Sequence, residues 1–302
     1  GWVWRITATK PKRRAGVLVL IGLVLFATVS GWAQDLRYVM RDTEYPMPGF
    51  AAEQDIGRAL ALVAPEQQPI LVLGNSIFYH WADRPPAGRY FHYPSFLMTS
   101  PLGAEAATEL GAALGGSDHG AVLLSNSHRT RLPPAVFDIL SVKWVPAATF
   151  SYPYQQDAVL LLPIRASVVD GGEPMAFEAG ISLQGLEATV LSTDAILLRL
   201  VWSVESPLEE NYSAFVHLNG PDGAFVAQHD SWPALGSRPT STWQPGEFIL
   251  DYHWVDLPPG SPSGLYEASV GLYRTETMQH VQLLEPTQTN VDSVSLPLPL
   301  EP

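Results

Sequence analysis

The sequence contains no cysteine among its 302 residues. Disulfide bonds, a thiol nucleophile and cysteine-ligated metal sites are therefore excluded. Charged residues are also scarce, at 16% of the chain, whereas an average soluble domain has roughly 25%. The basic residues are unevenly placed, because the first 14 residues hold five of the 17 Lys and Arg and no Asp or Glu.

The rest of the chain is strongly acidic, with 12 Lys and Arg against 30 Asp and Glu. An acidic surface repels nucleic acid and anionic lipid headgroups. We therefore set nucleic-acid binding aside as a function.

One long uncharged run interrupts this pattern, from Gly16 to Ala33. Its 18 residues are near the lower limit for crossing a bilayer. Because Lys and Arg beside a membrane segment stay on the cytoplasmic side, the sequence predicts a cytoplasmic basic tail over 1–15 and a transmembrane helix over 16–33. The remainder is expected to be extracytoplasmic, anchored in the cell membrane.

A cleaved signal peptide is the alternative for the same run. Val17–Val29 would be its apolar stretch, and Gly31–Ala33 would be a small-x-small cleavage site. The chain begins with Gly1 rather than Met, so we expect a fragment of a longer protein and favour the internal helix. Both interpretations place the rest of the chain outside the cytoplasm.

Residues 34–165 alternate between two kinds of pattern. Apolar residues recur at helical spacing over 51–63, 104–114 and 134–144. Short, uniformly apolar runs lie between these segments and after them, at 70–73, 121–124 and 158–162. Such runs are typical of strands buried on both faces. The sequence predicts a small α/β domain with a mainly parallel sheet.

Residues 166–302 show strand patterns instead. Apolar and polar side chains alternate over 195–203, 248–254 and 266–272, and the turn residues Asn219–Gly223 separate two further strand-like runs. Glycine and proline fill the connections. The prediction is an antiparallel β-sandwich that forms a second domain.

Motifs for catalysis are sparse. Ser76 follows the first apolar run, where α/β proteins bind ligands, and 71–76 resembles the first block of the Gly-Asp-Ser esterases. Asn75 stands where that family has Asp, and the block that supplies its base is absent. A serine without a placed base is a poor nucleophile, so a turn role is favoured over a hydrolase centred on Ser76.

The eight histidines do not show metal-ligand spacing. We expect no metal site, no cofactor and no catalytic residue in this chain.

Two groups of aromatic residues are candidates for binding. The segment 79–93 combines five Tyr, Trp and Phe residues with two arginines, which suits a membrane interface or a lipid phosphate. Its candidate residues are Tyr79, Arg84, Arg89 and Tyr90. The alternative is a loop that packs its aromatic residues against the domain. In the sandwich, Trp202 and Trp254 are expected in the core, whereas Trp232 and Trp243 lie in a loop-rich segment and are candidates for stacking on a carbohydrate.

Several runs in the sandwich carry a family resemblance. They are 215–218, 222–223, 239–240, 245–247, 264–266 and 271–273, together with Gln228, Asp230, Trp243 and Asp251. This pattern looks like an accessory domain often appended to bacterial multi-spanning glycosyltransferases of the family similar to dolichyl-phosphate-mannose protein mannosyltransferases (glycosyltransferase family 39). Tyr79, Arg84–Pro86 and Arg89–Tyr90 resemble the loop that such proteins carry after their first outer strand.

The resemblance implies that catalysis takes place in another part of the full-length protein. The full-length protein would transfer a sugar from a polyprenyl-phosphate donor. The catalytic acidic residue of that family lies in the first outer loop, among helices that precede this chain, so no residue here inherits it. The leading hypothesis is an outward-facing, non-catalytic C-terminal part of such an enzyme, in contact with the lipid bilayer. The alternative is a membrane-tethered or secreted carbohydrate-binding protein that uses the β-sandwich to bind a glycan.

Overall fold

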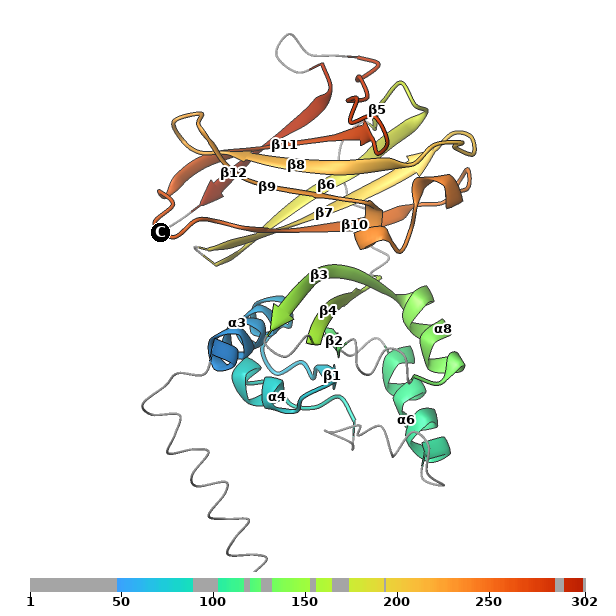
Figure 1. The fold of residues 1–302 in the computed structure, drawn as a ribbon, viewed down its shortest axis with the longest axis vertical. Helices are drawn as coiled ribbons and strands as arrows, with labels where there is room; N and C mark the ends of the chain where they lie inside the picture. Colours follow the sequence, from blue (N-terminus) through green and yellow to red (C-terminus); the bar gives the residue numbers. More distant parts are fainter. Residues whose placement is uncertain are drawn as a thin grey trace, which may run out of the picture. The chain divides into compact units, whose positions relative to one another are not determined.

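The strands of the described residues form three sheets of four strands each (Figure 1). The computed structural model describes residues 48–88, 103–116, 120–125, 132–152, 156–164, 174–192, 194–285 and 291–300. The predicted tail 1–15 and membrane helix 16–33 lie outside these ranges. Across the described ranges, no helix is both long enough and apolar enough to cross a membrane.

The first sheet has the strand order β1-β2-β4-β3. Its strands alternate along the chain with helices, as the sequence predicts for this part. The elements are α3 (Pro48–Val63), β1 (Leu71–Leu73), α4 (Ile77–Ala82), α6 (Gly103–Gly115), β2 (Val122–Ser125), α8 (Pro134–Lys143), β3 (Trp144–Tyr152) and β4 (Gln156–Pro163).

The prediction of a mainly parallel sheet is wrong. Only β1 and β2 are parallel, whereas β4 is antiparallel to both β2 and β3. The sequence analysis missed β3, which begins directly after α8. Only three residues separate Tyr152 from Gln156, and a connection of this length joins antiparallel neighbours, since a parallel pair needs a crossover of about a dozen residues or more.

Helices cover both faces of this sheet. On one face, α3 and α4 pack through Ile56, Leu60 and Phe78 against side chains of all four strands, among them Val72, Leu123, Val145 and Leu160. On the other face, α6 and α8 pack through Leu110 and Leu140 onto Leu71, Leu73, Val122, Leu124 and Leu161. Because β1 and β2 are buried on both faces, their sequences are continuously apolar rather than alternating.

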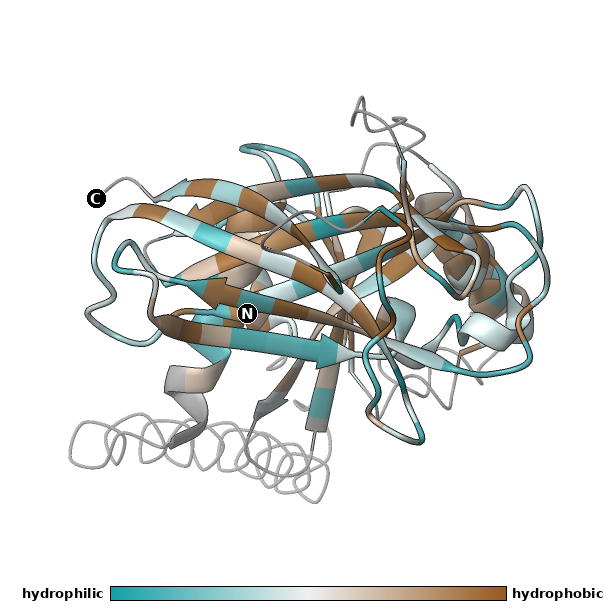
Figure 2. Ribbon diagram, turned by 90° about the horizontal axis from the view of Figure 1, so that it is seen from above, coloured by the Kyte–Doolittle hydropathy of each residue, from teal (hydrophilic) through white to brown (hydrophobic). Residues whose placement is uncertain are grey.

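The other two sheets form the predicted antiparallel β-sandwich, with strand orders β10-β7-β6-β5 and β12-β11-β8-β9. Hydrophobic and hydrophilic residues alternate along its strands (Figure 2). The strands are β5 (Met175–Ala176), β6 (Ile181–Ser192), β7 (Ala195–Val204), β8 (Tyr212–Asn219), β9 (Phe225–Ser231), β10 (Ile249–Asp256), β11 (Gly264–Arg274) and β12 (Ser293–Leu300).

The predicted hairpin around Asn219–Gly223 is confirmed, because β8 and β9 pair antiparallel on either side of it. Gly223 has a φ of 77°, a conformation that glycine adopts without steric cost. Trp202 is fully buried in the sandwich core, as predicted.

Strand β10 has two buried faces of different character. Ile249 and Val255 belong to the sandwich core. Tyr252, with the partly buried Leu250 and Trp254, instead packs into the core of the first sheet, where the Trp254 ring lies 5.9 Å from the ring of Phe150 in β3. Strand β10 therefore joins the sandwich to the first sheet.

The contact between α3 and α4 generates a test. A Cβ added at Gly57 would lie 2.2 Å from Trp81 Cβ and 2.9 Å from the Trp81 carbonyl carbon. Gly57→Ala should therefore lower the free energy of unfolding by about 1–3 kcal/mol in denaturant titrations, because the backbones of α3 and α4 must move apart to admit the methyl group. This loss should exceed the gain from the higher helix propensity of alanine.

Gly111→Ala is the matched control, since a Cβ there meets only Ile139 Cδ1 at 3.4 Å. It should raise stability by about 0.5–1 kcal/mol through helix propensity alone. Equal effects of the two changes would contradict the close α3–α4 packing.

Candidate functional site

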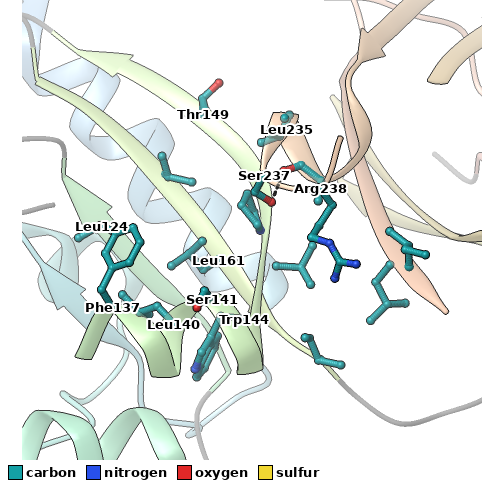
Figure 3. Close-up of a pocket in the computed structure, with 18 of the residues that line it drawn as sticks. Leu124, Phe137, Leu140, Ser141, Trp144, Thr149, Leu161, Leu235, Ser237 and Arg238 are labelled. Carbon is teal, nitrogen blue, oxygen red and sulfur yellow. Dashed lines mark hydrogen bonds between the residues drawn. The ribbon is translucent and has the colours of Figure 1, made fainter. Parts of the chain in front are cut away.

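A pocket of about 540 Å³ lies between the first sheet and the sandwich (Figure 3). Helix α8 and strands β3 and β4 form one wall; the other wall consists of β10 and the 3₁₀ turn η1 (Pro233–Gly236), which follows β9. Most of the lining is apolar and includes Phe137, Leu140 and Trp144 on one wall and Leu235, Phe248 and Leu250 on the other.

Several apolar side chains of the pocket remain open to solvent. Phe137 is 41% exposed, Ile164 45% and Phe248 66%. Helical spacing over 134–144 aligns Phe137 with Leu140 and so predicts that both are buried. In the structure Leu140 is buried, and Phe137 lines the pocket. A volume and lining of this kind are typical of sites for small, largely apolar ligands.

Among the described residues that line the pocket, Arg238 alone is charged. Its Nη2 donates to Glu247 Oε1 at 2.5 Å, and within the described part of the chain the other N–H groups of its guanidinium have no partner. The hydroxyls of Ser237 and Ser141 both donate to nearby backbone carbonyls, at 2.8 Å. Arg238 is thus the group of this pocket best suited to an anion.

The turn η1 has an unusual backbone. Ala234 and Leu235 are consecutive non-glycine residues in the left-handed region, with φ of 51° and 49°. Each such residue costs about 1–2 kcal/mol, and backbone of this kind persists only where its surroundings hold it. Since Ala234 and Leu235 both line the pocket, whatever holds the turn also shapes the pocket wall.

Asp251 of β10 is hydrogen-bonded to the backbone of the turn η1. Its Oδ1 accepts the backbone N–H of Ala234 at 2.8 Å, and its Oδ2 accepts Nε2–H of His253 at 3.0 Å and the indole N–H of Trp202 at 3.3 Å. Asp251 and His253 are both fully buried. A buried carboxylate with several donors and a cationic partner is well satisfied.

The protonation of His253 and that of the neighbouring His229 depend on each other and on Asp251. Burial lowers the pKa of His253, but the charge of Asp251, the Asp251 hydrogen bond and the His229 carbonyl raise it more, so the pKa lies above its ordinary value. A protonated His253 donates from Nδ1 toward the carbonyl and Nδ1 of His229, at 3.1 and 2.9 Å. Burial and the charge of His253 lower the pKa of His229 to about 4, against the attraction of Asp251.

The prediction that Arg84 is available to a lipid phosphate is wrong. Its Nε, Nη1 and Nη2 atoms make five hydrogen bonds, all to the backbone carbonyls of Ala61, Ala64, Ala82 and Asp83. A guanidinium has five N–H donors, so none is left for a ligand. Arg84 instead caps the carboxyl end of α3 and ties it to the end of α4.

Tyr79 also has a structural role. Its hydroxyl accepts the backbone N–H of Val72 at 2.9 Å, on the edge of β1 that β2 does not cover. Burial raises the pKa of Tyr79 to about 12, although the hydrogen bond from Val72 opposes this effect. Tyr79 therefore fits the alternative interpretation of 79–93, in which the aromatic residues of the segment pack against the domain. Arg89 and Tyr90 lie outside the described residues.

The two tryptophans proposed for carbohydrate stacking differ in the structure. Trp243 is fully buried in the sandwich core, and its indole N–H donates to the carbonyl of Arg238 at 3.0 Å. It cannot stack on a ligand, so its prediction as a surface residue is wrong. Trp232, directly before η1, is 44% exposed and remains a candidate.

Ser76 lies at the start of α4, where Asn75 Oδ1 accepts the backbone N–H of Ile77 at 3.1 Å. Among the described residues, no histidine or carboxylate is hydrogen-bonded to the Ser76 hydroxyl. No three His, Asp or Glu side chains of the described ranges gather closely enough to hold a metal ion.

Comparisons with known proteins assign no family. No family model matches the sequence, and no curated protein matches it. Among solved structures, the C-terminal domain of Wzt is 16% identical, covers 41% of this chain and 77% of its own, and has a TM-score of 0.29. A glycosyl hydrolase family 2 member from Bacteroides cellulosilyticus is 12% identical over 51% of this chain and 16% of its own, with a TM-score of 0.27.

A β-glucuronidase from Bacteroides uniformis is similar to the same degree, at 12% identity over 50% of this chain and 16% of its own, with a TM-score of 0.28. The matched segment is thus a small part of both hydrolases. At such TM-scores these likenesses assign neither a fold family nor a ligand to the chain.

Sequence reasoning missed the pocket and Arg238. The resemblance singled out 245–247, which includes Glu247, and 239–240, which directly follows Arg238, but not Arg238 itself. The available signal was Phe248, which was assigned to the apolar face of its strand. The pattern does not reveal that this face meets another sheet and leaves Phe248 exposed.

Replacement of Asp251 tests the polar network under η1. Asp251→Asn removes the partner of a buried cation, so the free energy of unfolding should fall by about 3–5 kcal/mol in denaturant titrations. Asp256→Asn, which changes an exposed carboxylate that accepts the indole N–H of Trp254, should change it by no more than about 0.5 kcal/mol. Similar losses for both variants would refute the role given to Asp251.

The pH dependence of stability tests the state of His229. Its pKa is about 4 in the folded protein and about 6.5 when unfolded, so the unfolded chain binds one more proton between these values. Stability should then fall as the pH falls through this window. In His229→Gln this contribution is absent, so the variant should lose less stability than the parent protein between pH 6.5 and pH 4. Parallel profiles would show that His229 does not titrate as described.

Proposed function

We propose that this chain is the outward-facing, non-catalytic C-terminal part of a membrane glycosyltransferase that uses a polyprenyl-phosphate sugar donor, and that its pocket holds the apolar chain of an amphiphile. The pocket between the sheet and the sandwich carries this proposal. Its walls are apolar, and its one charged lining residue is a cation.

The chemistry of the pocket favours an isoprenyl or alkyl phosphate. Burying the exposed parts of Phe137, Ile164 and Phe248 under an apolar chain is favourable by about 25 cal/mol per Å² of apolar surface removed from water. Arg238 can donate to a phosphate from the N–H groups that Glu247 leaves open, and charge-assisted bonds of this type are the strong ones.

The predicted anchor at 16–33 completes the proposal. It would keep the pocket close to a bilayer, in which polyprenyl phosphates reside, and the Lys and Arg before it would remain cytoplasmic. No catalytic step is assigned to this chain. Its role is to bind and position a lipid-linked substrate for residues elsewhere in the enzyme.

Geranyl phosphate is a water-soluble probe for this function. The full chain in phosphatidylcholine nanodiscs should bind it in calorimetric titrations, with empty nanodiscs as the blank. Arg238→Ala should weaken binding about tenfold or more, because a charge-assisted hydrogen bond contributes about 1.5–3 kcal/mol. Binding of geraniol, which lacks the phosphate, should not change.

Arg274→Ala is the matched control. Arg274 is 39% exposed, like Arg238, and is paired with Glu210 on the sandwich surface, outside the pocket. It should leave geranyl phosphate binding unchanged. Absence of binding to the parent chain, or equal weakening by both arginine changes, would refute the proposal.

A carbohydrate-binding protein is the second candidate function. Exposed Trp232 favours it, since an accessible indole can stack on a sugar ring. If Trp232 is the stacking residue, Trp232→Ala should abolish binding of a neutral trisaccharide.

A further inference from the structure

A row of five aromatic and imidazole rings crosses the outer face of the sheet β12-β11-β8-β9. The ring centroids of Tyr273 and His280 lie 6.3 Å apart, those of His280 and Phe215 4.8 Å, those of Phe215 and His217 4.8 Å, and those of His217 and Phe225 6.0 Å. None of these rings belongs to the sandwich core.

Strand register places the row on the outer face. In β8, Ala214, Val216 and Leu218 point into the core, so Phe215 and His217 point outward. Phe215 lies opposite Gly271 of β11, and a Cβ at Gly271 would come within 2.4 Å of its ring. The glycine therefore lets the Phe215 ring lie against the strand, where it supports both imidazoles.

The open end of the row lies on β8 and β9. Phe225 is 59% exposed, and the His217 side chain 34%. Phe215, whose ring contacts His217, is buried at 2%. Exposed rings that rest on a buried one are held in place before a ligand arrives, which lowers the entropy cost of binding.

Hydrogen-bonding groups border these rings. The Asp230 carboxylate lies opposite Phe215 on β9, with Oδ1 3.8 Å from His217 Nε2. Gln228 lies opposite His217. At the other end, His280 Nδ1 contacts Asp292 Oδ2 at 2.8 Å. The carboxylates accept hydrogen bonds and the glutamine amide both donates and accepts.

Flat apolar rings bordered by acceptors match a sugar, whose ring carries a C–H face and an edge of hydroxyl donors. We propose that this outer face binds a neutral oligosaccharide, with one pyranose stacked on Phe225 beside the His217 ring, which lies at 84° to it, and with its hydroxyls donating to Asp230. Acidic sugars are disfavoured, because Asp230 and Asp292 and the acidic chain as a whole repel them.

This site is separate from the pocket. Residues of β8, β9 and β11 do not line the pocket, and the rings of the row do not contact it in the described structure. The glycan site therefore goes beyond the proposed function, and either one can fail alone.

Saturation-transfer difference NMR on the full chain in nanodiscs tests the site. The probes are maltotriose, cellotriose and mannotriose, with trigalacturonic acid as the acidic counterpart. At least one neutral trisaccharide should receive saturation at its ring protons. Phe225→Ala, which removes the stacking ring, and His217→Ala, which removes the ring that flanks and supports it, should each weaken its binding about tenfold, equivalent to roughly 1.4 kcal/mol.

Two substitutions, one of a phenylalanine and one of a tryptophan, serve as controls. Phe248→Ala removes an exposed ring of the pocket, and Trp232→Ala removes the other candidate for stacking; neither should affect the trisaccharide. Conversely, Phe225→Ala should leave geranyl phosphate binding unchanged, which distinguishes this site from the pocket.

Three results would overturn the proposal. They are the absence of binding by all three neutral trisaccharides, equal binding of trigalacturonic acid, and loss of binding in Trp232→Ala with retention in Phe225→Ala. The last result would move the glycan site to the η1 turn.

Discussion

The buried pair of Asp251 and His253 is the interaction on which the candidate site depends. One carboxylate accepts hydrogen bonds from the His253 imidazole, the Trp202 indole and the backbone of Ala234. It thereby links the neighbouring strands β7 and β10 of one sheet to a turn whose left-handed backbone is unfavourable by itself. Removing one partner of such a pair leaves an uncompensated buried charge, so loss of either residue alone is strongly destabilising.

The position of this pair connects stability to binding. Asp251 and His253 point into the sandwich. The alternate residues of the same strand, Leu250 and Tyr252, pack against the first sheet. A single strand thus fixes the turn η1 on one side and the contact with β3 on the other. The pocket lies where these two meet, and its shape is set by rigid elements on both walls. Arg238, on the chain just beyond η1, gives this apolar space a cationic group.

Local patterns predict much of the fold. Helical spacing located α3, α6 and α8, alternation located β7, β10 and β11, and the turn at 219–223 located β8 and β9, because these signals depend on neighbours along the chain. Strands β5, β6 and β12 were not located. Pairing direction and partner choice depend on distant residues, so β3 was missed and the sheet was expected to be mainly parallel. Alternation in β10 was recognised, but not that its apolar residues face another sheet while Asp251 and His253 lie inside the sandwich. Arg84 was mistaken for a ligand-binding residue because its carbonyl partners lie as many as 23 positions away.

Photo-crosslinking with a geranyl phosphate that carries a diazirine on its terminal isoprene would test the central claim most directly. With the full chain in nanodiscs, followed by peptide mapping, the account predicts labelling of α8 at Phe137 or Ser141 and of the segment that includes Phe248, with competition by unmodified geranyl phosphate. Labelling confined to residues 16–33, or spread over the sandwich surface without competition, would contradict the claim that this pocket holds the apolar chain.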